Sequence, residues 1–388
     1  MAAVGTVDEL IDTARTRTGL DDFGSDSFLE GLTVAVASCA ADGWLNDLGV
    51  TVFREQLIAF LSIRLSVEDW YRRHPEIDAQ EIVAPLFGLG LPRTGSTALS
   101  FLQAQDPQFR SLLAWEASMP TPPPEPDTYT TDPRIAQIAE QTAFMDQVAP
   151  RFKGMLPSEA DGPTECLQLL ALDFRSAMLF LAAGPEYRAW LTTCDMTPAY
   201  EYHRRVLKLL QWKFPPRPWR LKTPAHLHGI AALTTVYPDA RFVMTHRDIA
   251  QVIPSVVSLH DAMSEMIRNA PLPPAFAELE AGFWEAGLRT TLAFRDAGEE
   301  GRFFDIGFAD LQSDPLAEME RLYLWSGDDL TQQVAERMRT WWTSNPADKH
   351  GVHEYRPEDY GIDVDALRRQ FAFYNDRFIT PRARDASS

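Results

Sequence analysis

Residues 86–105 read LFGLGLPRTGSTALSFLQAQ and decide the fold that this sequence predicts. The apolar run at the start of the stretch predicts a strand, the glycines and proline in its middle predict a tight turn, and the pattern from Ser96 to Asp106 predicts a helix. The first amides of a helix have no partner within the helix and carry partial positive charge. The turn therefore predicts a binding site for a phosphate or a similar anion.

The side chains of this turn suit an anion as well. Gly90 and Gly95 allow the backbone to approach a ligand closely, Arg93 offers a planar set of donors, and Ser96 and Thr97 add hydroxyls. The glycine spacing matches the nucleotide triphosphate loop G-x-x-x-x-G-K-[ST], but Ser96 stands where that loop has its lysine. This disfavours an ATPase. An ordinary turn between a strand and a helix is the alternative that the segment alone leaves open.

The composition limits the partners of the chain. The 388 residues include 45% hydrophobic and 23% charged residues, as in a soluble globular protein. No apolar stretch is long enough to span a bilayer and the N-terminus lacks a signal-peptide pattern, so a cytoplasmic protein is expected. A formal net charge of −19 argues against nucleic acid and anionic membranes as partners. The three scattered cysteines suggest neither a disulfide framework nor a zinc cluster.

An anionic cofactor would be repelled by this net charge unless cations gather at its site. The sequence offers Arg93, Lys222 and Arg247, each at or just after the end of a predicted strand. The predicted strands alternate with helices and lie near residues 86–90, 219–222, 241–245 and 302–306. This pattern predicts an α/β fold in which a central parallel sheet is flanked by helices.

A second informative stretch is RFVMTHRDIAQVIPSVVSL at residues 241–259. It predicts a buried strand, a turn that carries Arg247, and a helix that carries Ser255. The two side chains are eight positions apart, which is about two helical turns, so they could converge on one anionic group. The alternative is that Arg247 pairs with a carboxylate.

Taken together, the two stretches resemble the sulfotransferase superfamily that uses 3'-phosphoadenosine 5'-phosphosulfate. The chain is most similar to the bacterial branch, including mycobacterial members, and the resemblance runs from about residue 80 to the end. The motifs that carry it are PRTGST (92–97), Trp115-Glu116 before a proline-rich loop, LKTPAHL (221–227), THRD (245–248) and HEYRPEDYG (353–361).

The resemblance implies a P-loop-like fold and a set of cofactor contacts. The 5'-phosphosulfate would be held by Pro92, Arg93, Thr94, Gly95, Ser96 and Thr97, and the 3'-phosphate by Arg247 and Ser255. Many cytosolic relatives have lysine at the position of Arg93. The catalytic histidine of those relatives has no clear counterpart here, and neither has their glycine-rich C-terminal loop, which Lys349 and Gly351 would partly replace.

Sulfuryl transfer needs a base for the acceptor hydroxyl, cations for the transferring and leaving oxygens, and exclusion of water. We expect Glu116 to be the base, because tyrosylprotein-type sulfotransferases with a similar loop use a glutamate at a similar distance downstream. Glu165, at the opening of an apolar helix, is the alternative. Arg93 and Lys222 are the expected cations, and no metal is required.

The expected organisation is a helical N-terminal buttress (1–80), an α/β core (81–340) with helical acceptor-site insertions near 130–215 and 255–295, and a C-terminal closing segment (341–388). Apolar side chains in the roofing segments favour a lipid or another apolar small-molecule alcohol as acceptor. They are Phe144, Met155, Met196, Met263, Met266 and Trp284. A nucleotide kinase and a catalytically inactive binding protein of the same fold are the alternative functions. The sequence leaves the oligomeric state open.

Overall fold

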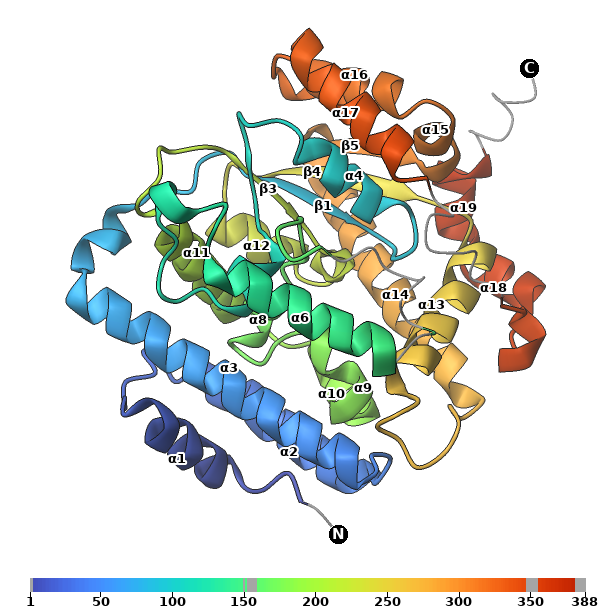
Figure 1. The fold of residues 1–388 in the computed structure, drawn as a ribbon. Helices are drawn as coiled ribbons and strands as arrows, with labels where there is room; N and C mark the ends of the chain where they lie inside the picture. Colours follow the sequence, from blue (N-terminus) through green and yellow to red (C-terminus); the bar gives the residue numbers. More distant parts are fainter. Residues whose placement is uncertain (1–2, 149–150, 152–158, 347–354, 381–388) are drawn as a thin grey trace.

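A five-stranded parallel sheet lies at the centre of the protein (Figure 1). The computed structural model describes residues 3–148, 151, 159–346 and 355–380. The strand order is β2-β3-β1-β4-β5, so β1 lies in the middle. The strands are β1 (Leu86–Gly90), β2 (Arg110–Ser111), β3 (Trp219–Lys222), β4 (Arg241–His246) and β5 (Phe303–Gly307). The predicted parallel sheet and its four predicted strands are confirmed, and the two-residue edge strand β2 is additional.

Alternate residues of the strands face opposite layers of helices, as the two-residue period of a strand requires. Leu86, Val243 and Ile306 pack in one hydrophobic cluster with α4, α16 and α17. Phe87, Phe242 and Phe303 pack in the larger cluster on the other face, with α11, α12 and α14. These helices are α4 (Ser96–Gln103), α11 (Thr197–Gln211), α12 (Ile230–Val236), α14 (Ala275–Phe294), α16 (Pro315–Ser326) and α17 (Gln332–Ser344).

Three N-terminal helices pack beside this core (Figure 1): α1 (Val7–Thr18), α2 (Phe28–Asp42) and α3 (Asp47–Arg73). All three lie within the region before residue 80 that the sequence predicts to be helical. Arg64 of α3 forms an ion pair with Asp173 at 3.2 Å, and both side chains are fully buried. In the part of the chain that the structure describes, no helix has the length and apolar character needed to cross a membrane.

The remaining helices in the described part of the chain are mostly short. They are α5 (Ala114–Ser118), α6 (Pro133–Val148), α8 (Leu167–Ala171), α9 (Phe180–Ala183), α10 (Pro185–Leu191), α13 (Ile249–Ser264), α15 (Phe308–Ser313), α18 (Val364–Gln370) and α19 (Ala372–Phe378). Single turns of 3₁₀ helix occur at Pro75–Ala79, Pro126–Thr128, Ala177–Leu179, Pro224–Leu227, Glu300–Arg302 and Pro357–Tyr360, and a π-helical turn at Arg295–Glu299.

Two local predictions differ from the structure. Glu116 lies inside the short helix α5 and not at the start of the proline-rich loop. Glu165 lies two residues before α8 and not on a helix. After β3, a 3₁₀ turn is followed by α12 with Gly229 between them, and a Cβ at this glycine would lie 2.8 Å from the ring of Tyr200.

The side chains that favoured an apolar acceptor do not gather in one place. Met196 and Trp284 are buried in the larger core cluster, where they serve packing. Phe144, Met263 and Met266 are exposed. Met155 lies outside the described residues, so the interpretation of these residues as one acceptor pocket is not supported by the described part of the chain.

Candidate active site

The loop between β1 and α4 has an unusual backbone that only a glycine-rich sequence can adopt easily. Gly90 has φ of 121°, Gly95 has φ of 85° and Arg93, although it carries a side chain, has φ of 64°. A Cβ at Gly90 would lie 2.5 Å from the carbonyl oxygen of Thr245 in β4. The Thr94 hydroxyl lies 2.6 Å from both the Leu91 carbonyl oxygen and the Thr245 hydroxyl. The loop is therefore held closely against the carboxyl end of β4.

The N-terminus of α4 is suited to an anion. Gly95 is the capping residue and has no side chain that could occupy the first amides of the helix. Ser96 and Thr97 follow in the first turn, as the sequence predicted. Unpartnered amides, the helix dipole and two hydroxyls then favour a bound phosphate or sulfate.

Lys222 connects this helix to a carboxylate. It is the last residue of β3, and its buried Nζ donates to the Thr97 hydroxyl at 3.1 Å and to Glu165 at 2.7 Å. The other carboxylate oxygen of Glu165 accepts from the Thr223 hydroxyl at 2.9 Å. A cation and a half-buried carboxylate therefore meet beside the predicted anion loop.

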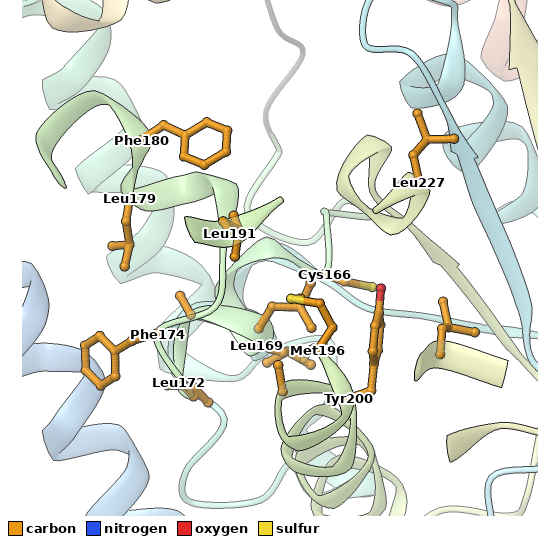
Figure 2. Close-up of a cluster of buried hydrophobic side chains, with 14 of the residues drawn as sticks. Cys166, Leu169, Leu172, Phe174, Leu179, Phe180, Leu191, Met196, Tyr200 and Leu227 are labelled. Atoms are coloured by element: carbon orange, nitrogen blue, oxygen red, sulfur yellow. The ribbon is translucent and has the colours of Figure 1, made fainter. Parts of the chain in front are cut away.

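The chain around Glu165 is anchored in the core. The amide of the next residue, Cys166, donates to the Lys222 carbonyl at 2.9 Å. Figure 2 shows the Cys166 side chain among Leu169, Met196 and Tyr200. Burial raises the pKa of the Cys166 thiol to about 12, so the thiol stays neutral and is unsuited to nucleophilic attack. The anchored backbone holds the Glu165 carboxylate in place.

The predicted pair on the other side of the loop also lies close together. Arg93 Nε donates to the Ser255 hydroxyl of α13 at 3.1 Å. Arg247 Nη1 donates to the carbonyl oxygen of Arg93 at 2.9 Å. Arg247 and Ser255 thus meet the same loop residue, Arg93, from β4 and from the following helix.

Arg247 has no carboxylate partner among the described residues, which disfavours the interpretation of a structural ion pair. Its Nε donates to Gln251 at 2.9 Å, and its guanidinium lies 4.1 Å from the centre of the Phe308 ring. The adjacent Asp248 instead pairs with Arg368 at 3.2 Å. Burial lowers the pKa of the Arg247 guanidinium.

The C-terminal segment reaches α13. The Tyr355 hydroxyl donates to the Gln251 carbonyl at 2.9 Å, and the Tyr360 hydroxyl meets Ser258 at 3.0 Å. Lys349 and Gly351, the predicted replacements for a glycine-rich closing loop, lie outside the described residues.

Glu116 lies in different surroundings from Glu165. Its side chain is fully buried, and one carboxylate oxygen accepts from Arg110 at 2.7 Å and from the Tyr129 hydroxyl at 3.2 Å. The other oxygen accepts from the Leu113 amide at 3.3 Å. These contacts brace α5, and none of them involves the loop at 90–97.

Two residues of the site were not among the site residues predicted from the sequence. Thr223 positions Glu165, and Thr245 holds the loop through Thr94. Both directly adjoin residues that the sequence singled out, because Thr223 follows Lys222 and Thr245 opens the THRD motif. Their position at the carboxyl ends of parallel strands could have indicated a role.

Comparison with known proteins agrees with this geometry. Residues 85–332 match the model of the Sulfotransferase family. The omega-hydroxy-beta-dihydromenaquinone-9 sulfotransferases Stf3 of Mycobacterium tuberculosis and Mycobacterium bovis are 25% identical over 254 residues, which are 63% of this chain and 63% of the length of those relatives.

Two solved structures are similar over nearly the whole chain. Sulfotransferase STF1 from Mycobacterium tuberculosis is 32% identical with a TM-score of 0.86, over 96% of this chain and 100% of that one. Sulfotransferase STF9 from Mycobacterium avium is 33% identical with a TM-score of 0.89, over 96% and 97% of the two chains. The chain belongs to the sulfotransferase family.

Proposed function

We propose that the protein transfers the sulfuryl group of 3'-phosphoadenosine 5'-phosphosulfate to the hydroxyl of a lipid alcohol. Two hydrogen bonds of Lys222 carry this proposal. Its ammonium donates to the Thr97 hydroxyl in the first turn of α4 and to the carboxylate of Glu165. A cation for the transferring group and a base for the acceptor are thereby side by side.

In the proposed reaction the acceptor oxygen forms a bond to the sulfur while the bond from the sulfur to the bridging phosphate oxygen breaks. Glu165 takes the proton of the acceptor hydroxyl, and 3'-phosphoadenosine 5'-phosphate leaves with the bonding electrons. Lys222 and the first amides of α4 stabilise the charge on the sulfuryl and leaving oxygens. Positioning and charge stabilisation suffice for such an in-line transfer.

Glu165 suits the role of base better than Glu116, which was the base expected from the sequence. A base must reach the acceptor proton, and Glu165 is half-buried beside the loop. Glu116 is fully enclosed and its carboxylate already accepts from a guanidinium, a hydroxyl and a backbone amide. Such a group serves the stability of α5.

The acceptor class rests on the curated relatives. The Stf3 proteins are named for a hydroxylated dihydromenaquinone, which is a long-chain lipid alcohol. Lys222 and Glu165 both lie within residues 85–332, which match the family model. A lipid alcohol is therefore the acceptor class to test first, with simple sugars as the contrasting class.

The test combines nucleotide binding with transfer. We expect calorimetric titration to show micromolar binding of 3'-phosphoadenosine 5'-phosphate and none of ATP with magnesium. Glu165→Gln keeps the acceptor atoms for Lys222 and removes the base, so it should bind the nucleotide as the parent protein does and lose about 10²–10⁴-fold in the rate of sulfation of a hydroxylated isoprenoid quinone.

Glu116→Gln is the matched control. It should lower the free energy of unfolding, by about 1–3 kcal/mol, because it weakens a buried hydrogen-bonded pair, while the folded enzyme keeps its rate. A large rate loss in Glu116→Gln with full activity in Glu165→Gln would assign the base to Glu116. Binding of ATP in place of the 3'-phosphorylated nucleotide would favour a kinase, and binding without transfer to any alcohol an inactive binding protein.

A further inference from the structure

The two oxygens of the Glu165 carboxylate are held by groups of different kinds. Oε1 accepts from the Lys222 ammonium at 2.7 Å, and Oε2 accepts from the Thr223 hydroxyl at 2.9 Å. The last torsion of a glutamate side chain has only a broad preference, so a single contact leaves the plane of the carboxylate free to turn. Two contacts on different oxygens fix that plane. The orientation of the carboxylate therefore depends on how firmly each partner is held in its own place.

Lys222 shares its ammonium among several acceptors. An ammonium has three donors, and here one goes to Glu165 and one to the Thr97 hydroxyl at 3.1 Å. In the proposed reaction the same group also stabilises the sulfuryl and leaving oxygens, on which charge develops during transfer. A lysine ammonium is moreover a point charge on a flexible stem of four carbons. Lys222 by itself is therefore a poor means of keeping the carboxylate in one orientation throughout the reaction.

Thr223, in contrast, is fixed to the sheet. It is fully buried, its amide donates to the Gly88 carbonyl of β1 at 3.1 Å, and its carbonyl accepts from the His226 amide at 3.3 Å. The following residue, Pro224, restricts Thr223 to extended backbone, and it has φ of −163° and ψ of 143°. Its branched side chain also has few rotamers. None of these restraints uses a ligand, so the hydroxyl keeps its position when one binds.

We propose that Thr223 is the positioning residue of the base: its hydroxyl holds Oε2 of Glu165 and orients the carboxylate towards the acceptor hydroxyl, while Lys222 serves the transferring group. The inference rests on the proposed function, in which Glu165 takes the acceptor proton. The Glu165 side chain is 29% exposed, so the lone pairs that Lys222 and Thr223 leave open are within reach of an acceptor. Misplacing a reacting group by about 1 Å can cost about 10²-fold in rate. Loss of the Thr223 hydroxyl therefore acts on transfer and not on nucleotide binding.

The test is a double-mutant cycle on the full-length protein, read in the single-turnover rate of sulfation of a hydroxylated isoprenoid quinone. Thr223→Val replaces the hydroxyl by a methyl group and should lower the rate by about 10- to 100-fold, the loss expected for one hydrogen bond to a charged group. In the Glu165→Gln background the same substitution should change the rate by less than about threefold, because the base is already absent. Calorimetry should show that Thr223→Val keeps its affinity for 3'-phosphoadenosine 5'-phosphate within about threefold.

Two further variants separate positioning from packing. Thr223→Ser keeps the hydroxyl and should keep the rate within about threefold of the parent. Thr291→Val is the matched control, because Thr291 is also fully buried and donates its hydroxyl to a backbone carbonyl, that of Leu227 at 2.9 Å, and this variant should keep the rate. Should Thr223→Val fail to fold, Thr223→Ala takes its place in the cycle.

The outcomes distinguish this proposal from the proposed function. An undiminished rate in Thr223→Val, or equal losses in the parent and Glu165→Gln backgrounds, would overturn the positioning role of Thr223 and leave Glu165 as the base. Full activity of Glu165→Gln, or a parent protein that does not bind the nucleotide, would instead refute the proposed function on which the role of Thr223 rests.

Discussion

Gly90→Ala is the perturbation that most directly examines the loop geometry. The added methyl would lie 2.5 Å from the Thr245 carbonyl oxygen and 3.0 Å from the Thr245 amide nitrogen, so backbone of β4 or of the loop must shift. Forcing extra volume into a packed site costs about 1–3 kcal/mol. Holding a residue with a side chain at φ of 121° costs about 1–3 kcal/mol more. Together these effects should lower the free energy of unfolding by about 2–6 kcal/mol.

The same shift should weaken nucleotide binding, because Thr245 holds the loop through the Thr94 hydroxyl. Urea unfolding and titration with 3'-phosphoadenosine 5'-phosphate measure the two effects. Gly282→Ala is the matched control: Gly282 is an exposed residue of α14 with no atom within 4 Å of the new methyl, and the substitution should stabilise the protein by about 0.5–1 kcal/mol. Gly90→Ala with stability and affinity within about 0.5 kcal/mol of the parent would refute the close approach of loop and strand.

Further predictions concern the cation and a buried histidine. Lys222→Met should lower the single-turnover rate of sulfation by about 10²–10³-fold, because it removes one preorganised donor to the sulfuryl oxygens, and an unchanged rate would contradict the role of Lys222. Burial lowers the pKa of His228 to about 3, so below about pH 6.5 the unfolded chain binds a proton that the folded protein does not, and stability falls as the pH drops towards 3. His228→Leu should reduce the loss of unfolding free energy between pH 7 and pH 5, measured by urea unfolding at both pH values, by about 2 kcal/mol, and an equally large loss in the variant would contradict it.

Most of the sheet could be predicted because its strands are short apolar runs followed by turn residues. The alternation that puts Leu86 and Phe87 on opposite faces is visible in the sequence. The edge strand β2 was not predictable, since a run of two residues (Arg110–Ser111) has no pattern, and it forms through pairing with β3. The long helix α3 begins at Asp47, where Asn46 caps it by accepting from the Gly49 amide.

The choice between two carboxylates could not be made from the sequence. Glu116 and Glu165 both lie between predicted core elements, and spacing along the chain does not tell which side chain is enclosed. Glu116 is buried because Arg110, which enters from the unpredicted strand β2, pairs with it. Glu165 lies beside Lys222 and the loop at 90–97 because the Cys166 amide donates to the Lys222 carbonyl at the end of β3. Both facts depend on contacts between segments far apart in the chain.

The sequence grouped Arg93 with Lys222 because both are cations near the same loop, whereas in the structure they contact different elements. The chain leaves β1 through the loop, enters β3 on one side of it and then β4 on the other. Lys222, at the end of β3, reaches Thr97 and Glu165. Arg93 reaches Ser255 in the helix that follows β4. The sequence alone could not separate the two side chains in this way, because the separation depends on the order of the strands in the sheet.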